Sequence, residues 1–311
     1  MMFAAAMLIA LAIDAAIGWP DALYRRIGHP VTWIGALICA LEVRLNIDGA
    51  RRKSNGVVTF VVVVAAAALP AYAITLALPQ GWTGALIMGV LAWPLVAARS
   101  MYTHVAAVAR PLQAGDLAGA RREVSMIVGR DPAQLNSSGV ARAALESLAE
   151  NTSDGIIAPL FWGVIFGLPG IAAYKAINTL DSMIGHKSPR YQDFGWFSAR
   201  TDDWVNLIPA RLTGALFALT SPAPRRAWAV MLADARAHRS PNAGWPEAAL
   251  AGALNIRLSG PRVYENHIAN EPWLNATAPD PSPAHITQGL RLYTRALAAM
   301  AVLMTALAAL A

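Results

Sequence analysis

Residues 146–170 read ESLAENTSDGIIAPLFWGVIFGLPG, which places three carboxylates directly before an uncharged run. Glu146, Glu150 and Asp154 are spaced four residues apart, and like charges at that spacing weaken a helix by roughly 0.2–0.5 kcal/mol per pair. The uncharged residues 156–174 have the length of a membrane segment, which needs about 17–25 apolar residues. The stretch therefore predicts a polar helix that leads into the membrane and carries carboxylates in need of a positive partner.

The whole chain has the composition of a membrane protein. Of its 311 residues, 56% are hydrophobic and only 14% are charged, against about 25% charged in soluble domains. Residues 57–79 and 81–98 are further uncharged runs, and weaker candidates are residues 1–19, 204–220 and 296–311. We therefore expect an all-α integral membrane protein with about five or six membrane-inserted helices and additional cytoplasmic helical segments.

The composition argues against three other features. The first apolar run lacks a basic start and contains Asp14, which is unlike a cleaved signal peptide. The single cysteine, Cys39, excludes an internal disulfide framework. The net charge of +6 is not concentrated in one block, so nucleic-acid binding is not expected.

The distribution of basic residues predicts the orientation of the chain. Residues 20–56 contain six arginines and lysines against three acidic residues, so this segment is expected on the cytoplasmic side. Residues 57–79 would then cross outward and residues 81–98 would return. Residues 99–151 are accordingly expected in the cytoplasm.

The sequence GLPG at residues 167–170 interrupts the third uncharged run. Glycine and proline there predict a break between two helical arms, residues 157–166 and 171–180. The arms would form a re-entrant hairpin or a full crossing, and we prefer the hairpin because it keeps the next polar segment on the cytoplasmic side.

We divide the chain into four parts: 1–98, an N-terminal membrane region with a basic loop; 99–155, a cytoplasmic helical insert; 156–224, the hairpin, a polar site segment and a membrane helix; and 225–311, a cytoplasmic segment and a C-terminal membrane helix.

Three polar clusters, in residues 146–154, 178–211 and 234–254, carry the candidate chemistry. The chain has no phosphate-binding glycine loop, dinucleotide motif or zinc-protease motif, and its six histidines are scattered. Carboxylate and amide oxygens with few histidines favour Mg²⁺, and the lysine and arginines of the second cluster suit phosphate. This pattern fits phosphoryl or acyl-phosphate chemistry at a membrane surface, and it also fits an ion-coupled transporter with charged groups at broken helices.

Four stretches closely resemble the adenosylcobinamide-phosphate synthase family, the CobD/CbiB family of cobalamin biosynthesis. They are GHPVTWIG at residues 28–35, ARAALESLAENTSDGIIAPLFW at 141–162, AYKAINTLDSMIGHKSPRYQDFGWFSARTDDWVNLIPARLT at 173–213, and HRSPNAGWPEAALAGAL at 238–254. The resemblance implies a ligase at the cytoplasmic face of the bacterial inner membrane. Its reaction would join adenosylcobyric acid to (R)-1-amino-2-propanol O-phosphate, or a related amino-alcohol phosphate, with ATP and Mg²⁺.

Under this resemblance, each polar cluster receives an expected role. An acyl phosphate is the expected activated intermediate, which requires Mg²⁺ and cations around the phosphoryl group. The expected catalytic residues are Glu146, Glu150, Asp154 and His238, with His238 or a carboxylate as base. The expected substrate- or phosphate-binding residues are Lys187, Arg190, Arg200, Asn178, Asn242 and Glu247. The expected metal ligands are Glu150, Asn151, Asp154, Asp181, Asp202 and Asp203.

Two other functional classes remain open at this point, a transporter of a polar metabolite and a scaffold for other pathway enzymes. A transporter should place ionisable groups within its spans, but within the candidate spans only Asp14 and Arg211 are charged. This distribution favours the enzyme. The expected partners are the two organic substrates and the lipid bilayer, together with other enzymes of the pathway or a second copy of the chain.

Overall fold

A computed structural model describes residues 2–129, 131–264 and 267–310 of the chain. These residues are almost entirely helical, with four short strands, which confirms the prediction of an all-α fold. Two compact units emerge from the contacts: unit 1 comprises Met1–Ala98, Ala158–Asn206 and Ala301–Ala311, and unit 2 comprises Arg99–Ile157 and Leu207–Met300. Each unit is therefore assembled from segments that are far apart in the sequence.

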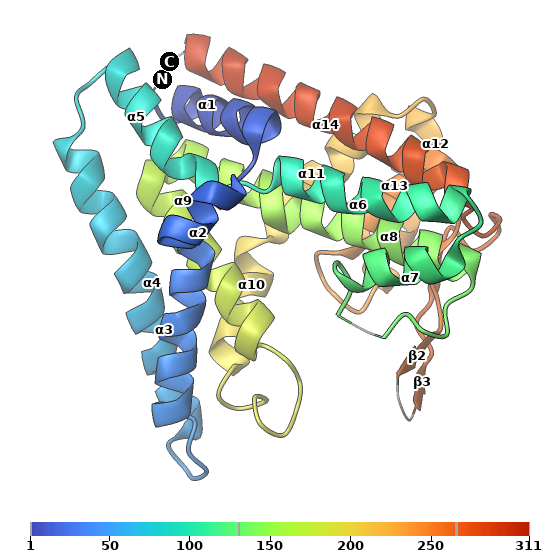
Figure 1. The fold of residues 1–311 in the computed structure, drawn as a ribbon, viewed down its shortest axis with the longest axis horizontal. Coiled ribbons are helices and arrows are strands. Elements are labelled where there is room, and N and C mark those ends of the chain that lie inside the picture. The colour runs from blue at the N-terminus through green and yellow to red at the C-terminus, as the bar shows by residue number, and fades with distance from the viewer. Residues whose placement is uncertain (1, 130, 265–266, 311) are drawn as a thin grey trace. The chain divides into compact units, whose positions relative to one another are not determined.

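Unit 1 is built from long apolar helices (Figure 1). They are α1 (Met2–Ile17), α2 (Asp21–Ile27), α3 (Pro30–Leu45), α4 (Arg52–Ala77), α5 (Trp82–Ala92), the short 3₁₀ turn η1 (Trp93–Leu95), α9 (Ala158–Ile184) and α10 (Trp196–Val205), joined by the last residues of α14 (Pro283–Leu310). Helix α4 packs against α3 and α9, and α3 and α4 run side by side in Figure 1.

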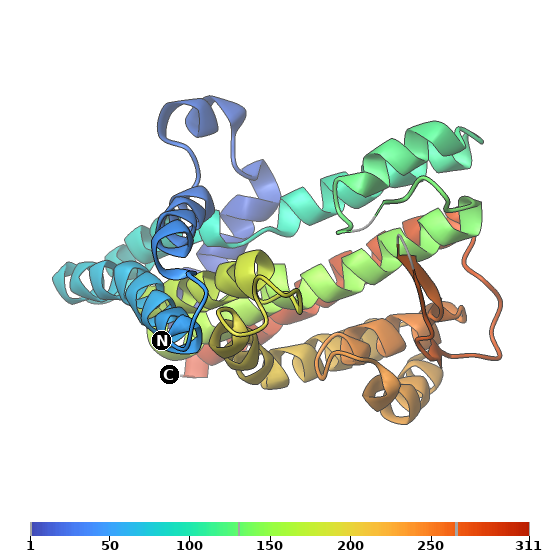
Figure 2. The same ribbon diagram turned by 90° about the horizontal axis from the view of Figure 1, so that it is seen from below.

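Unit 2 is a second group of helices with two small antiparallel strand pairs. Its elements are α6 (Ala98–Gln113), α7 (Leu117–Ser125), α8 (Ser137–Thr152), the π-helix η2 (Ser153–Ile157), α11 (Leu207–Thr220), α12 (Pro224–Asp234), η3 (Ala235–Ala237), α13 (Gly244–Leu254), β1 (Leu258–Ser259), β2 (Arg262–Tyr264), β3 (His267–Ala269), β4 (Trp273–Leu274) and most of α14. Strand β1 pairs with β4 and β2 with β3. The β2–β3 hairpin extends downward from the helices of this unit in Figure 1, and it points toward the viewer in Figure 2, which shows the molecule from below.

Four helical stretches of the described residues are long and apolar enough to cross a membrane, namely Arg52–Ala77, Trp82–Gln113, Ser137–Ile184 and Pro283–Leu310. A fifth candidate is a bent pair, described below. The weaker candidate at residues 204–220 forms α11, whose 14 residues extend only about 21 Å at 1.5 Å per residue. A bilayer core is about 30 Å thick, so α11 is too short to span it alone.

The bent pair consists of Met2–Ile17 and Asp21–Leu45, which meet at 111° and form a broken span or a re-entrant loop. Three indole N–H groups hold the turn: Trp93 donates to the Gly18 carbonyl at 3.0 Å, Trp33 to the Ile27 carbonyl at 2.9 Å and Trp19 to the Gly28 carbonyl at 3.2 Å. The sequence predicted a simple first span and did not predict this bend.

Helix α9 contains the break that the sequence predicted. Gly167 has the non-helical angles φ 68° and ψ −149°, so α9 is two helical arms merged across a kink. The positive φ requires glycine, and a Cβ there would also lie 2.9 Å from the Phe3 ring. The predicted arms are confirmed, and the choice between a re-entrant hairpin and a full crossing for this segment stays a prediction.

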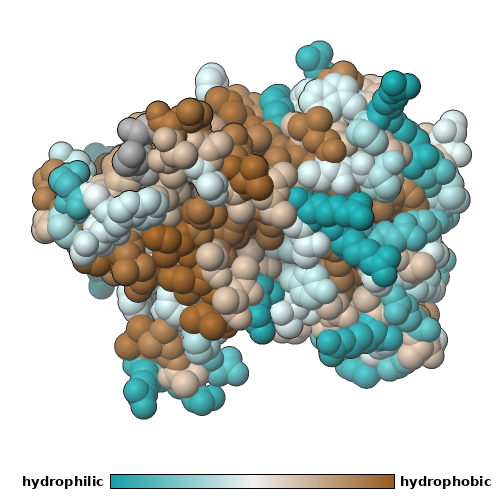
Figure 3. Space-filling view, turned by 90° about the horizontal axis from the view of Figure 1, so that it is seen from above, coloured by the Kyte–Doolittle hydropathy of each residue, from teal (hydrophilic) through white to brown (hydrophobic). Residues whose placement is uncertain are grey.

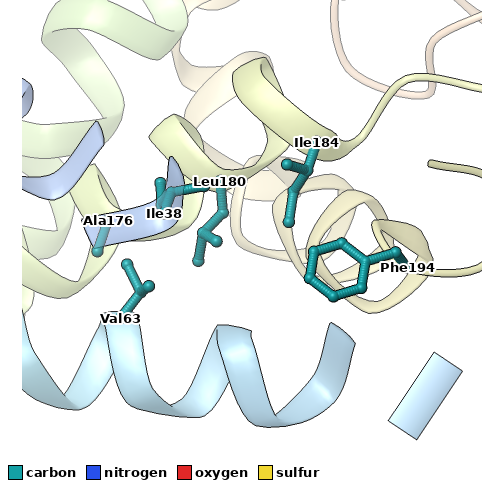
Figure 4. Close-up of a cluster of buried hydrophobic side chains, with 6 residues drawn as sticks. All are labelled: Ile38, Val63, Ala176, Leu180, Ile184 and Phe194. Carbon is teal, nitrogen blue, oxygen red and sulfur yellow. The ribbon is translucent and has the colours of Figure 1, made fainter. Parts of the chain in front are cut away.

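The polar loop between α9 and α10 is anchored by Phe194. Its side chain is completely buried in a cluster formed by Ile38, Val63, Ala176, Leu180 and Ile184 (Figure 4). The backbone directly after Phe194 is also tightly packed, because a Cβ on Gly195 would lie 1.6 Å from the Ile184 carbonyl oxygen. This packing fixes the position of the polar residues that precede Phe194.

Large apolar side chains cover the outside of the α4 helix. Leu69, Leu76 and Tyr72 are 65%, 69% and 53% exposed. Hydrophobic residues also cover a broad part of the face shown in Figure 3. Soluble proteins rarely expose apolar patches of this kind, so these surfaces are consistent with contact to lipid.

We predict that Phe194→Ala will strongly destabilise the protein in detergent. Removal of a buried phenylalanine side chain typically costs about 3–5 kcal/mol, so the variant should unfold at a clearly lower temperature. The control is Phe166→Ala in α9, since Phe166 is 55% exposed and should have a much smaller effect. Equal unfolding temperatures for the two variants would contradict the anchoring role of Phe194.

Candidate functional site

A polar pocket lies between the α9–α10 loop and α10 in unit 1. Its cavity volume is about 170 Å³, and it is lined by Gly185, His186, Lys187, Tyr191, Gln192, Trp196, Ala199, Arg200 and Asp203. Two of the predicted phosphate-binding residues, Lys187 and Arg200, thus line the same pocket, together with the predicted metal ligand Asp203. The tight packing of Phe194 and Gly195 holds the loop side of this pocket in place.

Arg190 does not line the pocket. Its guanidinium forms a bidentate contact with Glu42 of α3, with Nε 2.9 Å from Oε1 and Nη2 3.0 Å from Oε2. Hydrogen bonding to this carboxylate raises the pKa of Arg190 above its usual value. The Arg190 carbonyl also accepts hydrogen bonds from Asn46 and Arg52. In this conformation Arg190 fastens the loop to α3 and α4, and its role in phosphate binding stays a prediction.

A buried carboxylate lies on α10 beside the pocket. Asp202 Oδ2 accepts a 2.9 Å hydrogen bond from the Asn206 amide, whose oxygen in turn accepts one of 2.9 Å from the Tyr174 hydroxyl. Burial, followed by the negative charge of Asp181, raises the pKa of Asp202 to about 7, and the amides of Asn206 and Asn178 partly oppose this rise. The structure thus brings together three predicted residues, Asn178, Asp181 and Asp202.

Asp203 has a different environment from its neighbour Asp202. It lines the pocket, and its carboxylate lies 3.9 Å from the Arg200 guanidinium, both side chains being partly exposed. Partial burial raises the pKa of Asp203, while the positive charges of Arg200 and Lys187 lower it. The pocket therefore carries cations and one carboxylate within a small volume.

The acidic pair Asp181 and Asp202 offers a partial fit to Mg²⁺. Within the described residues no group of three or more histidine, cysteine, aspartate or glutamate side chains is arranged to hold a metal. However, Mg²⁺ is often bound through only one or two carboxylates, with water and substrate phosphates as its other ligands. The buried Asp202 Oδ1 has no hydrogen-bond partner of good geometry among the described residues, so its environment would accept a cation.

In unit 2, Glu146 is buried and not on a solvated face of α8. Its exposed fraction is 6%, and its Oε1 accepts a 2.8 Å hydrogen bond from the backbone N–H of Ser259. Ser259 has a φ of 60°, which is unfavourable for a residue other than glycine. Glu146 therefore helps to hold a strained corner of the chain, a contact that the sequence did not predict.

The other residues of the first cluster are more accessible. Glu150 and Asn151 are exposed, and Asp154 is half-buried within the π-helix η2. The Asn151 amide donates to the Ser147 carbonyl at 2.9 Å. Short π-helices occur frequently at functional sites, which keeps Glu150 and Asp154 as candidates.

The third cluster forms a buried polar group in unit 2. His238 Nε2 lies 3.6 Å from Glu247 Oε1, and His238, Asn242 and Glu247 are all buried. The Ser240 N–H donates to His238 Nδ1 at 3.1 Å, so a neutral His238 ring carries its proton on Nε2, toward Glu247. Two of the three predicted residues, His238 and Glu247, are thus neighbours, and the ring orientation points the His238 Nε2 proton toward Glu247.

Four residues of these sites were missed by sequence reasoning, namely Glu42, Tyr174, Asn206 and Ser259. Asn206 lies four residues after Asp202 on a helix, which is the spacing of a contacting pair, so the sequence contained this signal. Glu42 and Arg190 are separated by 148 residues, and no local pattern could have paired them.

Comparisons with known proteins give one consistent family. The model of the family described as "CobD/Cbib protein" matches residues 7–293. A Rhodobacter capsulatus protein named "Cobalamin biosynthesis protein CobD" is 66% identical over 310 residues, covering 100% of this chain and 99% of the relative. Proteins of the same name from Brucella suis and Sinorhizobium fredii are 49% and 45% identical, covering 86% and 96% of this chain and 85% and 95% of the relatives. No solved structure matches the chain.

We predict that Asp202→Asn will change how stability depends on pH. Because the pKa of Asp202 is raised to about 7 in the folded protein, folding favours the protonated form, and ionisation between about pH 4 and pH 7 destabilises the fold. The variant cannot ionise here. Its unfolding free energy relative to the wild type should therefore rise across this window, by on the order of 1 kcal/mol per unit of pKa displacement, and level off above it.

The measurement is the unfolding temperature of both proteins in detergent and EDTA, recorded from pH 4 to pH 8. Parallel curves for the wild type and the variant would show that Asp202 ionises as an ordinary exposed carboxylate does.

Proposed function

The chain belongs to the CobD/CbiB family of cobalamin biosynthesis proteins, and from this premise we propose that it is an acid–amine ligase embedded in the membrane. The proposed reaction joins adenosylcobyric acid to (R)-1-amino-2-propanol O-phosphate, or to a related amino-alcohol phosphate. ATP is the co-substrate, Mg²⁺ the metal ion and adenosylcobinamide phosphate the product.

The observation that carries this proposal is the pocket of unit 1. Lys187 and Arg200 line one small cavity, next to the buried Asp202 of α10, which has an acidic neighbour in Asp181 of α9. The proposed ligase must bind a phosphorylated amine as well as Mg²⁺ with ATP, and cations suit phosphate oxygens while carboxylates suit Mg²⁺. A structural membrane scaffold would not need this arrangement.

The proposed chemistry has two steps. A carboxylate oxygen of adenosylcobyric acid attacks the terminal phosphorus of ATP, ADP leaves, and an acyl phosphate forms. The free amine of the amino-alcohol phosphate then attacks the acyl carbon, inorganic phosphate leaves, and the amide bond is complete. The amine arrives as an ammonium, so a base must first remove a proton.

The residues of this chain supply positions and charges for those steps. Lys187 and Arg200 are placed to bind the phosphate oxygens of a substrate. Asp181 and Asp202 of unit 1 would hold Mg²⁺, which would supply positive charge to the phosphoryl oxygens. Asp203 of unit 1 and, separately, Glu150, Asn151 and Asp154 of unit 2 stay predicted metal ligands. A carboxylate or His238 would serve as the base, and His238 would first have to release the Ser240 N–H from its Nδ1. Asn242 and Glu247 would orient the amino alcohol.

We further propose that the site faces the cytoplasm, because ATP is available there and because the basic residues of segment 20–56 favour a cytoplasmic position. The apolar helices support an integral membrane location. The bacterial inner membrane, a second copy of the chain and other enzymes of the pathway stay predictions of the same proposal.

The direct test is incubation of the purified chain with adenosylcobyric acid, amino-alcohol phosphate and MgATP, followed by mass analysis of the corrinoid. The expected product is heavier by the amino-alcohol phosphate minus one water, and its formation should depend on each substrate and on Mg²⁺. Absence of this product from a folded, membrane-competent preparation would overturn the proposal that the chain is a ligase on its own.

For the first cluster, we predict that Glu150→Gln or Asp154→Asn will lower turnover by on the order of a hundredfold or more, because a bound metal ion stabilises transition-state charge by several kcal/mol. Both variants should still accumulate in the membrane. The matched control is Glu123→Gln, which changes an exposed carboxylate of α7 in the same unit. Normal rates and normal Mg²⁺ dependence in both test variants would remove this cluster from the site.

For the pocket, Lys187→Ala should lower kcat/KM by roughly ten- to hundredfold, because a charge-assisted hydrogen bond contributes about 1.5–3 kcal/mol. Arg200→Lys should also be impaired, since lysine cannot reproduce a bidentate contact with phosphate. The control is Arg44→Ala, an exposed arginine of α3 that does not line the pocket.

The competing explanation for Arg200 is a purely structural pair with Asp203. At 3.9 Å and with exposed side chains, such a pair contributes about 0–1 kcal/mol. Recovery of activity in a double variant that removes both charges would identify a structural ion pair and exclude phosphate binding by Arg200.

A further inference from the structure

The size of the unit 1 pocket restricts the ligand that it can enclose. Its volume is about 170 Å³, below the roughly 300–1,000 Å³ of pockets that enclose drug-sized ligands. An entire nucleotide or a corrin ring is therefore too large. A small phosphate ester, or a single phosphoryl group of a larger molecule, matches this volume.

The charges of the pocket distinguish these two kinds of ligand. Lys187 and Arg200 would attract a phosphate, but Asp203 lines the same cavity and would repel one. A ligand that carries only phosphate charge therefore meets one unfavourable group. A ligand with a phosphate at one end and an ammonium at the other is complementary to all three side chains.

A further cation lies close to the aromatic wall of the pocket. Trp196 lines the pocket, and the Lys53 ammonium lies 3.9 Å from the centroid of its ring. Lys53 therefore adds positive charge near this wall, which favours a small anion.

The Arg200–Asp203 pair can open for such a ligand at low cost. The two charged groups are 3.9 Å apart, which is longer than a hydrogen bond of good geometry, and exposed pairs of this kind are weak. In place of the Arg200–Asp203 contact, the ligand would bring its phosphate to Arg200 and its ammonium to Asp203.

We propose that this pocket is the subsite for a small zwitterionic aminophosphate, in which Lys187 and Arg200 bind the phosphate and Asp203 binds the ammonium. The proposal rests on the proposed ligase function, whose amino-alcohol phosphate substrate has this charge pattern, and it assigns the nucleotide to a different place. It also gives Asp203 a role in substrate recognition in place of its predicted role as a metal ligand. Asp203 would then bind the amino alcohol in place of Asn242 and Glu247, which lie in unit 2.

Binding measurements on the full chain in detergent test the proposal. The ligands are 1-amino-2-propanol O-phosphate, isopropyl phosphate, which lacks the amine, and a non-hydrolysable ATP analogue with Mg²⁺. The proteins are the wild type, Asp203→Asn, Lys187→Ala and the control Arg44→Ala, each checked for an unchanged unfolding temperature.

Asp203→Asn should weaken binding of the aminophosphate by roughly tenfold or more. The same change should leave isopropyl phosphate binding equal or make it tighter, because a repulsive charge is removed. Lys187→Ala should weaken both phosphate esters, and neither variant should affect the ATP analogue. Arg44→Ala should match the wild type with every ligand.

Three results would overturn the subsite. One is aminophosphate binding by Asp203→Asn that is as tight as in the wild type. Another is loss of affinity for the ATP analogue in Lys187→Ala with normal binding of the phosphate esters. The third is a wild type that binds no aminophosphate with or without the ATP analogue. Product formation by the same wild-type sample separates the two proposals. If the sample forms product but gives any of these three results, only the subsite proposal is rejected. If the sample forms no product, the proposed ligase function is rejected.

Discussion

The packing of Phe194 into the core of unit 1 is the constraint on which the candidate pocket depends. Phe194 is completely buried among apolar side chains of α3, α4 and α9, and a Cβ on Gly195 would collide with the Ile184 carbonyl. A Cβ on Gly56 of α4 would likewise lie 1.9 Å from the Phe194 carbonyl oxygen. A loop between two helices would normally be mobile, but this one is held by backbone approaches that only glycine allows.

Polar contacts also hold the loop between α9 and α10 in place. The bidentate pair of Arg190 with Glu42 fastens the loop to α3, and Glu42 is buried. Breaking such a pair would leave a buried carboxylate without its cation, which is costly. The pair therefore fixes the conformation of the loop, and it leaves Lys187 and Arg200 as the cations that line the pocket. Arg190 and Arg200 thus have different roles in the structure, although the sequence placed both in one polar cluster.

Local patterns in the sequence predicted the features that depend on local physics. Uncharged runs predicted the long helices, and the glycine and proline of residues 167–170 predicted the kink in α9, where Gly167 has a positive φ. The resemblance of three long motifs predicted the family. Residue types also identified Lys187, Arg200 and Asp203, which the fold collects around one pocket.

Features that depend on distant contacts were not predictable in the same way. The bend between α1 and α3 is held in part by Trp93, which lies 75 residues from its partner Gly18. The burial of Glu146 follows from a contact with Ser259, 113 residues away. On a helical wheel Glu146 lies opposite the apolar stripe, and only the packing of the unit around α8 shows that this face is covered too.

Glu146 and Asp202 are both buried carboxylates, but their surroundings indicate different roles. Glu146 accepts a backbone N–H from a residue with an unfavourable φ, so this contact supports the local fold. Asp202 lies near a second carboxylate, and its raised pKa shows that folding works against its charge. If Asp202 only stabilised the fold, an uncharged amide at this position would do so without the repulsion from Asp181. A cation shared by Asp181 and Asp202 would remove this repulsion. This pair, rather than Glu146, is therefore the stronger basis for the proposed Mg²⁺ site.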